Sequence, residues 1–172
     1  GNPSFSTDVT IWQNKLGAVD QTIRNSWLEV QGKWTGLEPI FIGSADIRVQ
    51  LPEDSKRFDA IDSSWKELMK EACTQFDPII TATAEGRQEM LDEMLKMLEL
   101  CEKSLNDYLD TKKAAFPRFY FVAAADLLDI LSKGSSPHLL QKHFSKNFDA
   151  INAIRFEKNP DDTFSKSALG MI

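Results

Sequence analysis

The sequence predicts a mainly α-helical protein, built of elongated antiparallel helical bundle segments with a short β-hairpin at the C-terminal end. Long apolar stripes at helical spacing, prolines and glycines that separate them, and an alternating segment near the end support this fold class. A chain of 172 residues that is 42% hydrophobic and 27% charged is long enough to bury a core. We expect a single fragment with three parts: a long-helix bundle over about 7–115, an aromatic junction with short helices over 116–152, and a truncated hairpin over 153–172.

The first predicted helix carries one apolar stripe that includes three tryptophans. Its members follow steps of three and four, with one doubled four: Trp12, Leu16, Val19, Ile23, Trp27, Val30, Trp34 and Leu37. The doubled four is a stutter, which locally straightens a coiled-coil-like seam. Tryptophans at helical spacing normally fill a core, and no basic groove accompanies these, so we favour helix packing over a base-stacking or cofactor role.

Prolines and glycines delimit the next two helices. Pro39 and Gly43 are expected to end the first helix, and 40–52 to form an ordered connection with apolar anchors. Pro52 begins a second helix that ends before Pro78. Its predicted core positions are Phe58, Ile61, Trp65, Leu68, Ala72 and Phe76. The charged residues between them are interpreted as a solvated face rather than as paired catalytic carboxylates.

A third helix, from Arg87 to Ala115, follows a loosely apolar connection over 79–84 and has the most regular spacing in the chain. Its predicted seam is Leu91, Met94, Leu98, Cys101, Leu105 and Tyr108. Met90, Met94 and Met97 are interpreted as core fillers rather than as an adaptable binding face. Cys73 and Cys101 are predicted to be buried free thiols, which fits a reducing compartment.

The next segment places four aromatic residues among six positions after the third helix: Phe116, Pro117, Arg118, Phe119, Tyr120 and Phe121. It is predicted to be a structural joint or an intramolecular contact, and we favour a joint whose aromatics are buried. A short helix from Asp126 to Ser132 should stop at Gly134. A fifth helix should begin at Ser136 and Pro137 and be lined by Leu140, Phe144, Phe148 and Ile151. A strand at 154–157 and a turn at 159–162 then lead to a second strand that begins at Phe164.

Motifs for catalysis or cofactors are missing from the sequence. We find no glycine-rich phosphate loop, nucleophile elbow, CxxC or HExxH motif, and the five-residue spacing of His138 and His143 does not suit a helical zinc pair. The net charge of −6 disfavours general electrostatic binding to nucleic acid or anionic lipid. No apolar run is long enough to span a membrane. The N-terminus lacks signal-peptide features and an initiator Met, which suggests an internal segment or a processed chain.

Seven phrases resemble, in order, the linker region of dynein heavy chains. They lie at 27–31, 37–41, 43–47, 50–52, 116–121, 126–131 and 140–144, and FPRFYF followed by DLLDIL is the most specific. The phrases at 41–48 and 51–58 resemble axonemal outer-arm heavy chains more than cytoplasmic ones. Ala123, Ala124 and Ala125 depart from the more polar residues that the family often has there.

The resemblance implies a mechanical arm that lies across a ring of ATPase modules in the same heavy chain. It implies no catalysis and no cofactor in this fragment, with ATP and magnesium bound elsewhere in the parent chain. The implied partners are the ATPase ring and the rest of the linker, and, through the parent chain, dynein subunits and microtubules. The implied location is the cytoplasmic cytoskeleton of a cilium or flagellum. A stand-alone spectrin-like interaction module is the alternative that the residues leave open.

Overall fold

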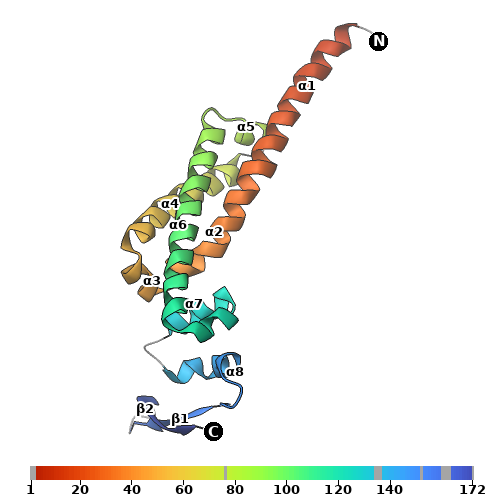
Figure 1. Ribbon diagram of the computed structural model, residues 1–172. Helices are drawn as coiled ribbons and strands as arrows, with labels where there is room; N and C mark the ends of the chain where they lie inside the picture. Colours follow the sequence, from red (N-terminus) through yellow and green to blue (C-terminus); the bar gives the residue numbers. More distant parts are fainter. Residues whose placement is uncertain (1–2, 76, 134–136, 152, 160–163, 172) are drawn as a thin grey trace. The chain divides into compact units, whose positions relative to one another are not determined.

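A computed structural model describes residues 3–75, 77–133, 137–151, 153–159 and 164–171 (Figure 1). Phe76, Gly134, Ser136, Ile172 and most of the predicted turn at 159–162 lie outside the described residues. The chain divides into two compact units. Unit 1 comprises residues 1–43 and 51–104, and unit 2 comprises residues 44–50 and 105–172. The three-part division expected from the sequence stays a prediction.

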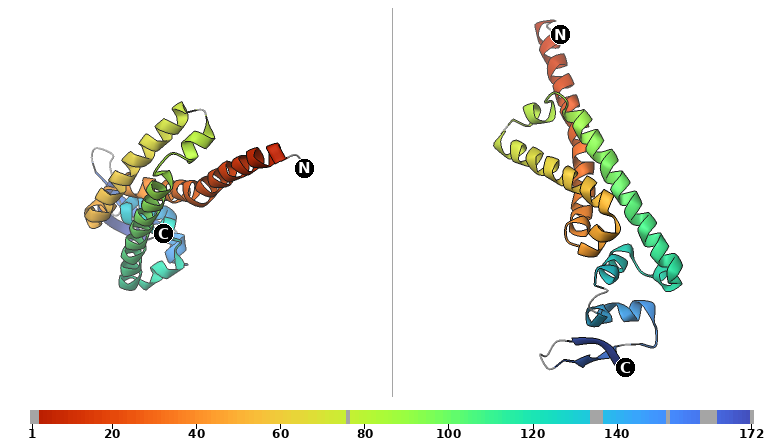
Figure 2. Two further views of the ribbon diagram at one scale, coloured as in Figure 1. Left: turned by 90° about the horizontal axis from the view of Figure 1, so that it is seen from above. Right: turned by 90° about the vertical axis from the view of Figure 1, so that its left-hand side faces the viewer.

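Unit 1 is a helical bundle. A continuous helical stretch runs through α1 (Pro3–Gln21), the π-helix η1 (Thr22–Trp27) and α2 (Leu28–Phe41). α4 (Pro52–Thr74) and α5 (Pro78–Ala82) follow, and α6 (Arg87–Ala115) contributes its residues up to 104. The first turns of α1 extend beyond the other helices of this unit (Figure 2). The helical character of both helices, the start predicted for α4 and the limits predicted for α6 are confirmed. α4 ends at Thr74, earlier than its predicted stripe, whose last member, Phe76, lies outside the described residues.

The first apolar stripe is buried only in its C-terminal half. Val30 and Leu37 lie in the core as predicted, whereas Trp12 and Leu16 are each more than half exposed. The prediction that all three tryptophans of this stripe fill a core is therefore wrong for Trp12. α1 reaches past its neighbours in unit 1, so no other described helix of this unit covers its outer turns.

The core of unit 1 is aromatic, and α4 supplies its centre. Trp65 is buried, with its ring centre 5.9 Å from that of Trp27 and 6.3 Å from that of Trp34. Phe58 stacks on Phe41 with ring centres 5.2 Å apart. Together with Ile61 and Leu68, these residues confirm the predicted apolar face of α4. Burial of so many large rings supplies much of the stability of a bundle of this size.

α6 packs along the bundle with the predicted spacing. Leu91, Met94, Leu98 and Cys101 are buried in unit 1, where burial raises the pKa of the Cys101 thiol. Cys73, by contrast, is exposed, so the prediction that both thiols are buried is wrong. Cys73 follows Ala72 of the predicted stripe, and one residue along a helix turns the side chain by roughly 100°, away from the core.

The connections contain short helices where the sequence predicted none. α3 (Ala45–Gln50) begins after Ser44, whose hydroxyl accepts a hydrogen bond from the Ile47 N–H. α5 begins after Asp77, whose carboxylate accepts from the Ile79 N–H at 2.8 Å. Both are N-caps, which satisfy amides that a short helix leaves free. The side-chain caps therefore outweigh the poor stability of such short helices.

The end of α2 also differs from the prediction in detail. Pro39 lies inside the helix, which continues to Phe41, and the Gly43 N–H donates to the Pro39 carbonyl at 3.1 Å. A Cβ atom on residue 43 would lie 2.4 Å from that carbonyl oxygen. Gly43 is therefore the residue that the helix end requires, as predicted, whereas Pro39 does not stop the helix.

Unit 2 contains α3, the end of α6 from Leu105, and a series of short elements. These are the 3₁₀-helix η2 (Pro117–Phe121), α7 (Ala124–Ser132), the 3₁₀-helix η3 (Pro137–His143), α8 (Phe144–Asn147), β1 (Ile154–Lys158) and β2 (Phe164–Met171). Its core comprises Leu109, Val122 and Leu127, against which Tyr108 and Phe119 pack. The helix predicted at Asp126–Ser132 is confirmed as α7, with a start two residues earlier.

The prediction of a single fifth helix that begins at Ser136 and Pro137 is wrong. A 3₁₀-helix and a four-residue α-helix replace it, and Phe148 is already extended. Leu140, Phe144 and Phe148 have helical spacing, but the winding changes after His143 and the backbone leaves the helix at Phe148.

The C-terminal hairpin is confirmed. β1 and β2 pair antiparallel, with Ile154 opposite Met171 and Phe156 opposite Ala168. Two irregularities interrupt the register. Among the described residues, no helix combines the length and apolar character needed to cross a bilayer.

Candidate functional site: the α7–α8 junction

The segment Phe116–Phe121 lies at one side of a junction within unit 2. Phe116 and Phe119 contact edge to face, with ring centres 4.8 Å apart, and Phe116 lies 6.5 Å from Phe148. Tyr120 and Phe121, however, are 62% and 85% exposed. The expected burial of these aromatics is therefore wrong for Tyr120 and Phe121, and Phe116 is also 38% exposed. The tight 3₁₀ turn that Pro117 begins directs successive side chains to different sides, so one face alone packs inward.

Arg118 joins this segment to α8. Its Nη1 donates to the Asn147 carbonyl at 2.8 Å, and its guanidinium carbon lies 4.8 Å from the centre of the Phe148 ring. Its partners among the described residues are thus a carbonyl and an aromatic face. A guanidinium over a ring is a favourable cation–π arrangement.

A cavity of about 190 Å³ lies between the aromatic segment, α7 and the η3–α8 segment. Its walls are mainly apolar, and its lining residues are Phe116, Phe119, Ile130, Leu140, His143, Phe144, Asn147 and Phe148. His143 Nδ1 and Asn147 Oδ1 are buried there without a hydrogen-bond partner. Buried polar atoms without a hydrogen-bond partner are uncommon in protein cores, so the polar groups of this junction are less completely hydrogen-bonded than those of a typical core.

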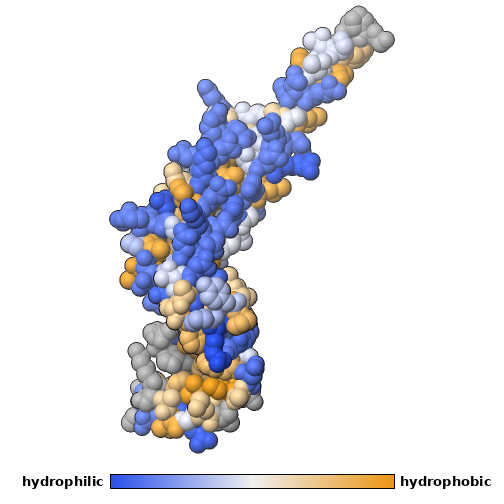
Figure 3. Space-filling model, viewed as in Figure 1, coloured by the Kyte–Doolittle hydropathy of each residue, from blue (hydrophilic) through white to orange (hydrophobic). Residues whose placement is uncertain are grey.

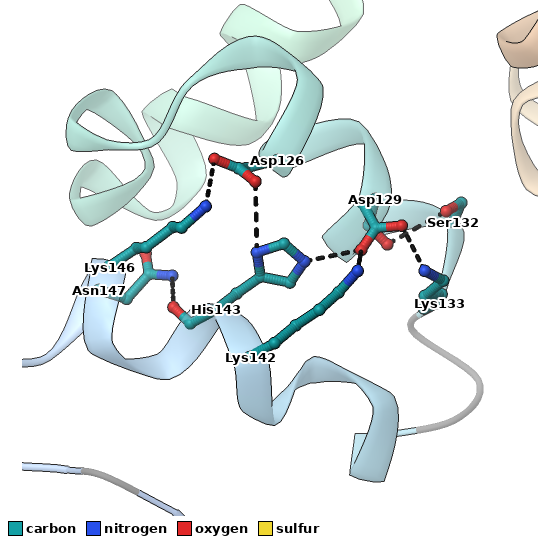
Figure 4. Close-up of polar contacts among 8 residues, drawn as sticks. All are labelled: Asp126, Asp129, Ser132, Lys133, Lys142, His143, Lys146 and Asn147. Atoms are coloured by element: carbon teal, nitrogen blue, oxygen red, sulfur yellow. Dashed lines mark hydrogen bonds and ion pairs between the residues drawn. The ribbon is translucent and has the colours of Figure 1, made fainter.

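Charged side chains connect α7 to the η3–α8 segment (Figure 4). Asp126 and Asp129 are three residues apart on α7 and therefore share a face. Lys146 Nζ donates to Asp126 at 2.7 Å, and Lys142 Nζ lies 2.8 Å from Asp129. His143 lies between the two carboxylates, with Nε2 2.7 Å from Asp129 and Nδ1 3.6 Å from Asp126.

The cations shift the ionisation of both carboxyl groups. Hydrogen bonds from Lys133, Lys142 and His143 hold the pKa of Asp129 well below its usual range. The hydrogen bond from Lys146 lowers the pKa of Asp126. Asp129 in turn raises the pKa of Lys142. Both carboxylates are thus ionised at neutral pH, and the cluster acts as an ionic clamp between two short helical segments.

The sequence did not predict this clamp. The spacing of His143 from His138 argues against a metal ligand, and the structure buries His143 between two carboxylates. The sequence pattern that could have indicated the clamp is Asp126-x-x-Asp129 on α7 and Lys142-His143-x-x-Lys146 on the η3–α8 segment. No group of three metal-binding side chains occurs among the described residues.

The fold is mainly helical, and the polar cluster described above holds segments of unit 2 together. The chain belongs to the dynein heavy chain family, since the family model for dynein heavy chain, N-terminal region 2 matches residues 2–172. The resemblance inferred from the sequence is thereby confirmed. The family assignment decides against a stand-alone spectrin-like module.

The similar proteins include axonemal heavy chains. The chain is 53% identical, over 99% of its length, to the dynein beta chain of the flagellar outer arm of Chlamydomonas reinhardtii. It is 48% identical to human dynein axonemal heavy chain 9 and 49% identical to the ciliary dynein beta chain of Tripneustes gratilla, each over 97% of this chain. The chain spans only 4% of the length of each of these relatives.

Proposed function

We propose that this chain is a non-catalytic mechanical linker segment of a dynein heavy chain. It transmits ATP-driven changes of the ring to microtubule-based motility in a cilium or flagellum. The match of residues 2–172 to dynein heavy chain, N-terminal region 2 carries this proposal. The names of the relatives, which include flagellar and ciliary chains, support the axonemal location.

The proposal places ATP hydrolysis outside this segment. A sequence without a phosphate loop supplies no cradle for the phosphates of ATP, so the nucleotide and magnesium bind elsewhere in the parent chain. The segment then acts through intramolecular contacts with the ATPase ring and the rest of the linker. Microtubules and other dynein subunits are reached through the parent chain.

The aromatic segment has two roles in this proposal. Phe116, Arg118 and Phe119 form the structural joint, because their recorded contacts are with one another or with α8 and the core of unit 2. Tyr120 and Phe121 form an intramolecular contact with another part of the heavy chain. Their exposure supports this second role, since large aromatic surfaces are seldom left in water without a partner.

The test uses the parent heavy chain with Tyr120→Ala and Phe121→Ala combined. Neither side chain supports the core of unit 2, so the melting temperature should be unchanged and ATP hydrolysis should persist. Microtubule gliding should slow several-fold because ring motion is no longer passed on. Val49→Ala is the matched control, since Val49 is also an exposed apolar residue of unit 2. Gliding at the speed of the control variant would refute the contact role.

A further inference from the structure

The winding of the first long helical stretch changes at η1. Over Thr22–Trp27 the helix is a π-helix, and the Leu28 N–H donates to the Ile23 carbonyl, five residues back. The segment reads TIRNSW and contains neither proline nor glycine, so no helix-breaking residue forces the wider turn. Single π-turns inside α-helices are rare and are frequently found at functional positions.

The π-turn decides which side chains face the bundle. Thr22 and Ser26 are buried, whereas Ile23 and Trp27, which the apolar stripe predicts inside, are only partly buried. Ile23 and Trp27 instead help to line an open cavity of about 450 Å³ beside α5. Two hydroxyl residues therefore occupy the positions at which the sequence pattern predicts apolar ones.

A polar network between η1 and α6 holds the Ser26 hydroxyl inside. Ser26 Oγ donates to Asp92 Oδ1 at 3.0 Å, and Gln88 Nε2 lies 2.6 Å from Ser26 Oγ and 2.8 Å from Asp92 Oδ1. A buried hydroxyl is tolerated when it has such partners. The network thus stabilises the π register, in competition with the apolar stripe.

The two registers differ by a rotation. A π-turn holds one residue more than an α-turn, and one residue of an α-helix corresponds to about 100° around the axis. In an uninterrupted α-helix, Leu16, Val19, Ile23, Trp27 and Val30 share one face. In the structure, the π-turn interrupts this face between α1 and α2. Phe5, Val9, Trp12 and Leu16 are each more than half exposed, and Figure 3 shows hydrophobic surface on the protruding part of α1.

We propose that Thr22–Trp27 is a register switch that exchanges between the π-turn seen here and an α-turn. The exchange rotates α1 about its own axis by roughly 100° relative to α2. The α register breaks the Ser26–Asp92–Gln88 network, buries the partly buried Ile23 and Trp27 more deeply, and aligns the stripe of α1 with that of α2. All these groups belong to unit 1, and the inference does not depend on the motor assignment.

Two variants of the 172-residue chain separate the registers. Deletion of the exposed Asn25 removes the extra residue, so the turn closes as an α-turn while α1 keeps the orientation seen here. Ser26→Ala removes the hydroxyl at the centre of the network and favours the α register. Gln88→Ala, which removes the amide that donates to both Ser26 and Asp92, is a second route to the same result. Ser63→Ala is the matched control, because the Ser63 hydroxyl bonds within α4 and outside the network.

Pulsed electron paramagnetic resonance between spin labels measures the rotation. Labels at Gln13 or Asn14 on α1 are each paired with one at Glu67 on α4, in a Cys73→Ser background because Cys73 is exposed. Gln13 and Asn14 point roughly 100° apart, so a rotation changes at least one of the two distances, by up to about 8 Å for a helix of ordinary radius.

The outcomes distinguish a switch from a fixed turn. The deletion variant should give one distance for each label pair, equal to the main distance of the wild type and of Ser63→Ala. Ser26→Ala and Gln88→Ala should give a second distance in at least one pair. A folded Ser26→Ala or Gln88→Ala that keeps the distances of the deletion variant in both pairs would overturn the proposal.

Discussion

Replacing Phe58 by Ala tests the aromatic core of unit 1. Phe58 is completely buried and stacks on Phe41, which is also completely buried. Removing a buried phenyl ring costs about 3–5 kcal/mol through lost transfer free energy and the cavity that remains. Because the ring pair with Phe41 contributes roughly 0.5–1.5 kcal/mol, the loss of stability should lie in the upper part of this range. For a chain of this size, the melting temperature should fall by about 6–20 °C.

Tryptophan fluorescence is the suitable assay for this variant. All four tryptophans, Trp12, Trp27, Trp34 and Trp65, belong to unit 1, so their emission follows the unfolding of that unit alone. Thermal and urea unfolding of Phe58→Ala is compared with that of Phe5→Ala. Phe5 is a phenylalanine of the same unit that is 68% exposed, and its removal should change the free energy of unfolding by less than about 0.5 kcal/mol.

Two results would refute this reasoning about the core. One is a loss below about 1 kcal/mol for Phe58→Ala, which would mean that the site collapses or admits water without cost. The other is an equal loss for Phe5→Ala, which would mean that α1 is covered in solution. Combining Phe41→Ala with Phe58→Ala should cost less than the sum of the two single changes, because the two share one cavity and one ring contact.

Three further predictions concern polar groups and a helix end. Because the pKa of Asp129 is lowered, its ion pairs stabilise unit 2 above about pH 4 and are lost as the pH falls further. NMR signals of unit 2 should show this pH dependence, and Asp129→Asn should flatten it. Arg87→Lys should cost about 1.5–3 kcal/mol in urea unfolding, since the buried Arg87 binds Glu71 at 2.7 Å, whereas no loss would show that Lys replaces it fully. Gly43→Ala should destabilise the end of α2 by about 1–3 kcal/mol in thermal unfolding, because its Cβ meets the Pro39 carbonyl, and an unchanged melting temperature would contradict that clash.

The elements that the sequence predicted well are those with a long, regular stripe. α6 begins at Arg87 and ends at Ala115, as the spacing from Leu91 onward indicated. Over such a length, many apolar positions lie on one helix face, so tertiary contacts seldom change the secondary structure that they indicate. α3 and α5 have six and five residues, too few for periodicity to be visible. Their existence depends on caps and neighbours instead.

The junction shows a second limit of sequence patterns. The phrases FPRFYF and DLLDIL resemble the family, yet the residues that join them to α8 lie far from them in the sequence. Arg118 meets Asn147 across 29 positions, and His143 meets Asp129 across 14. Local spacing does not specify which helix faces which, so these pairings required the structure. Complementary charge on the two segments was the available clue.

The π-helix shows how a sequence can contain two consistent patterns at once. Leu16, Val19, Ile23, Trp27 and Val30 satisfy the periodicity of a helical seam, and no rule based on hydrophobic spacing prefers Thr22 or Ser26 for the inside. A buried serine becomes favourable only when its partners are placed, and Gln88 and Asp92 come from a helix more than sixty residues away. The stutter at Val19, Ile23 and Trp27 marks the position at which the α seam is weakest, because a doubled step of four moves the stripe around the helix. The register chosen there therefore depends on the balance between a polar network and an apolar stripe, and small changes to either should move α1.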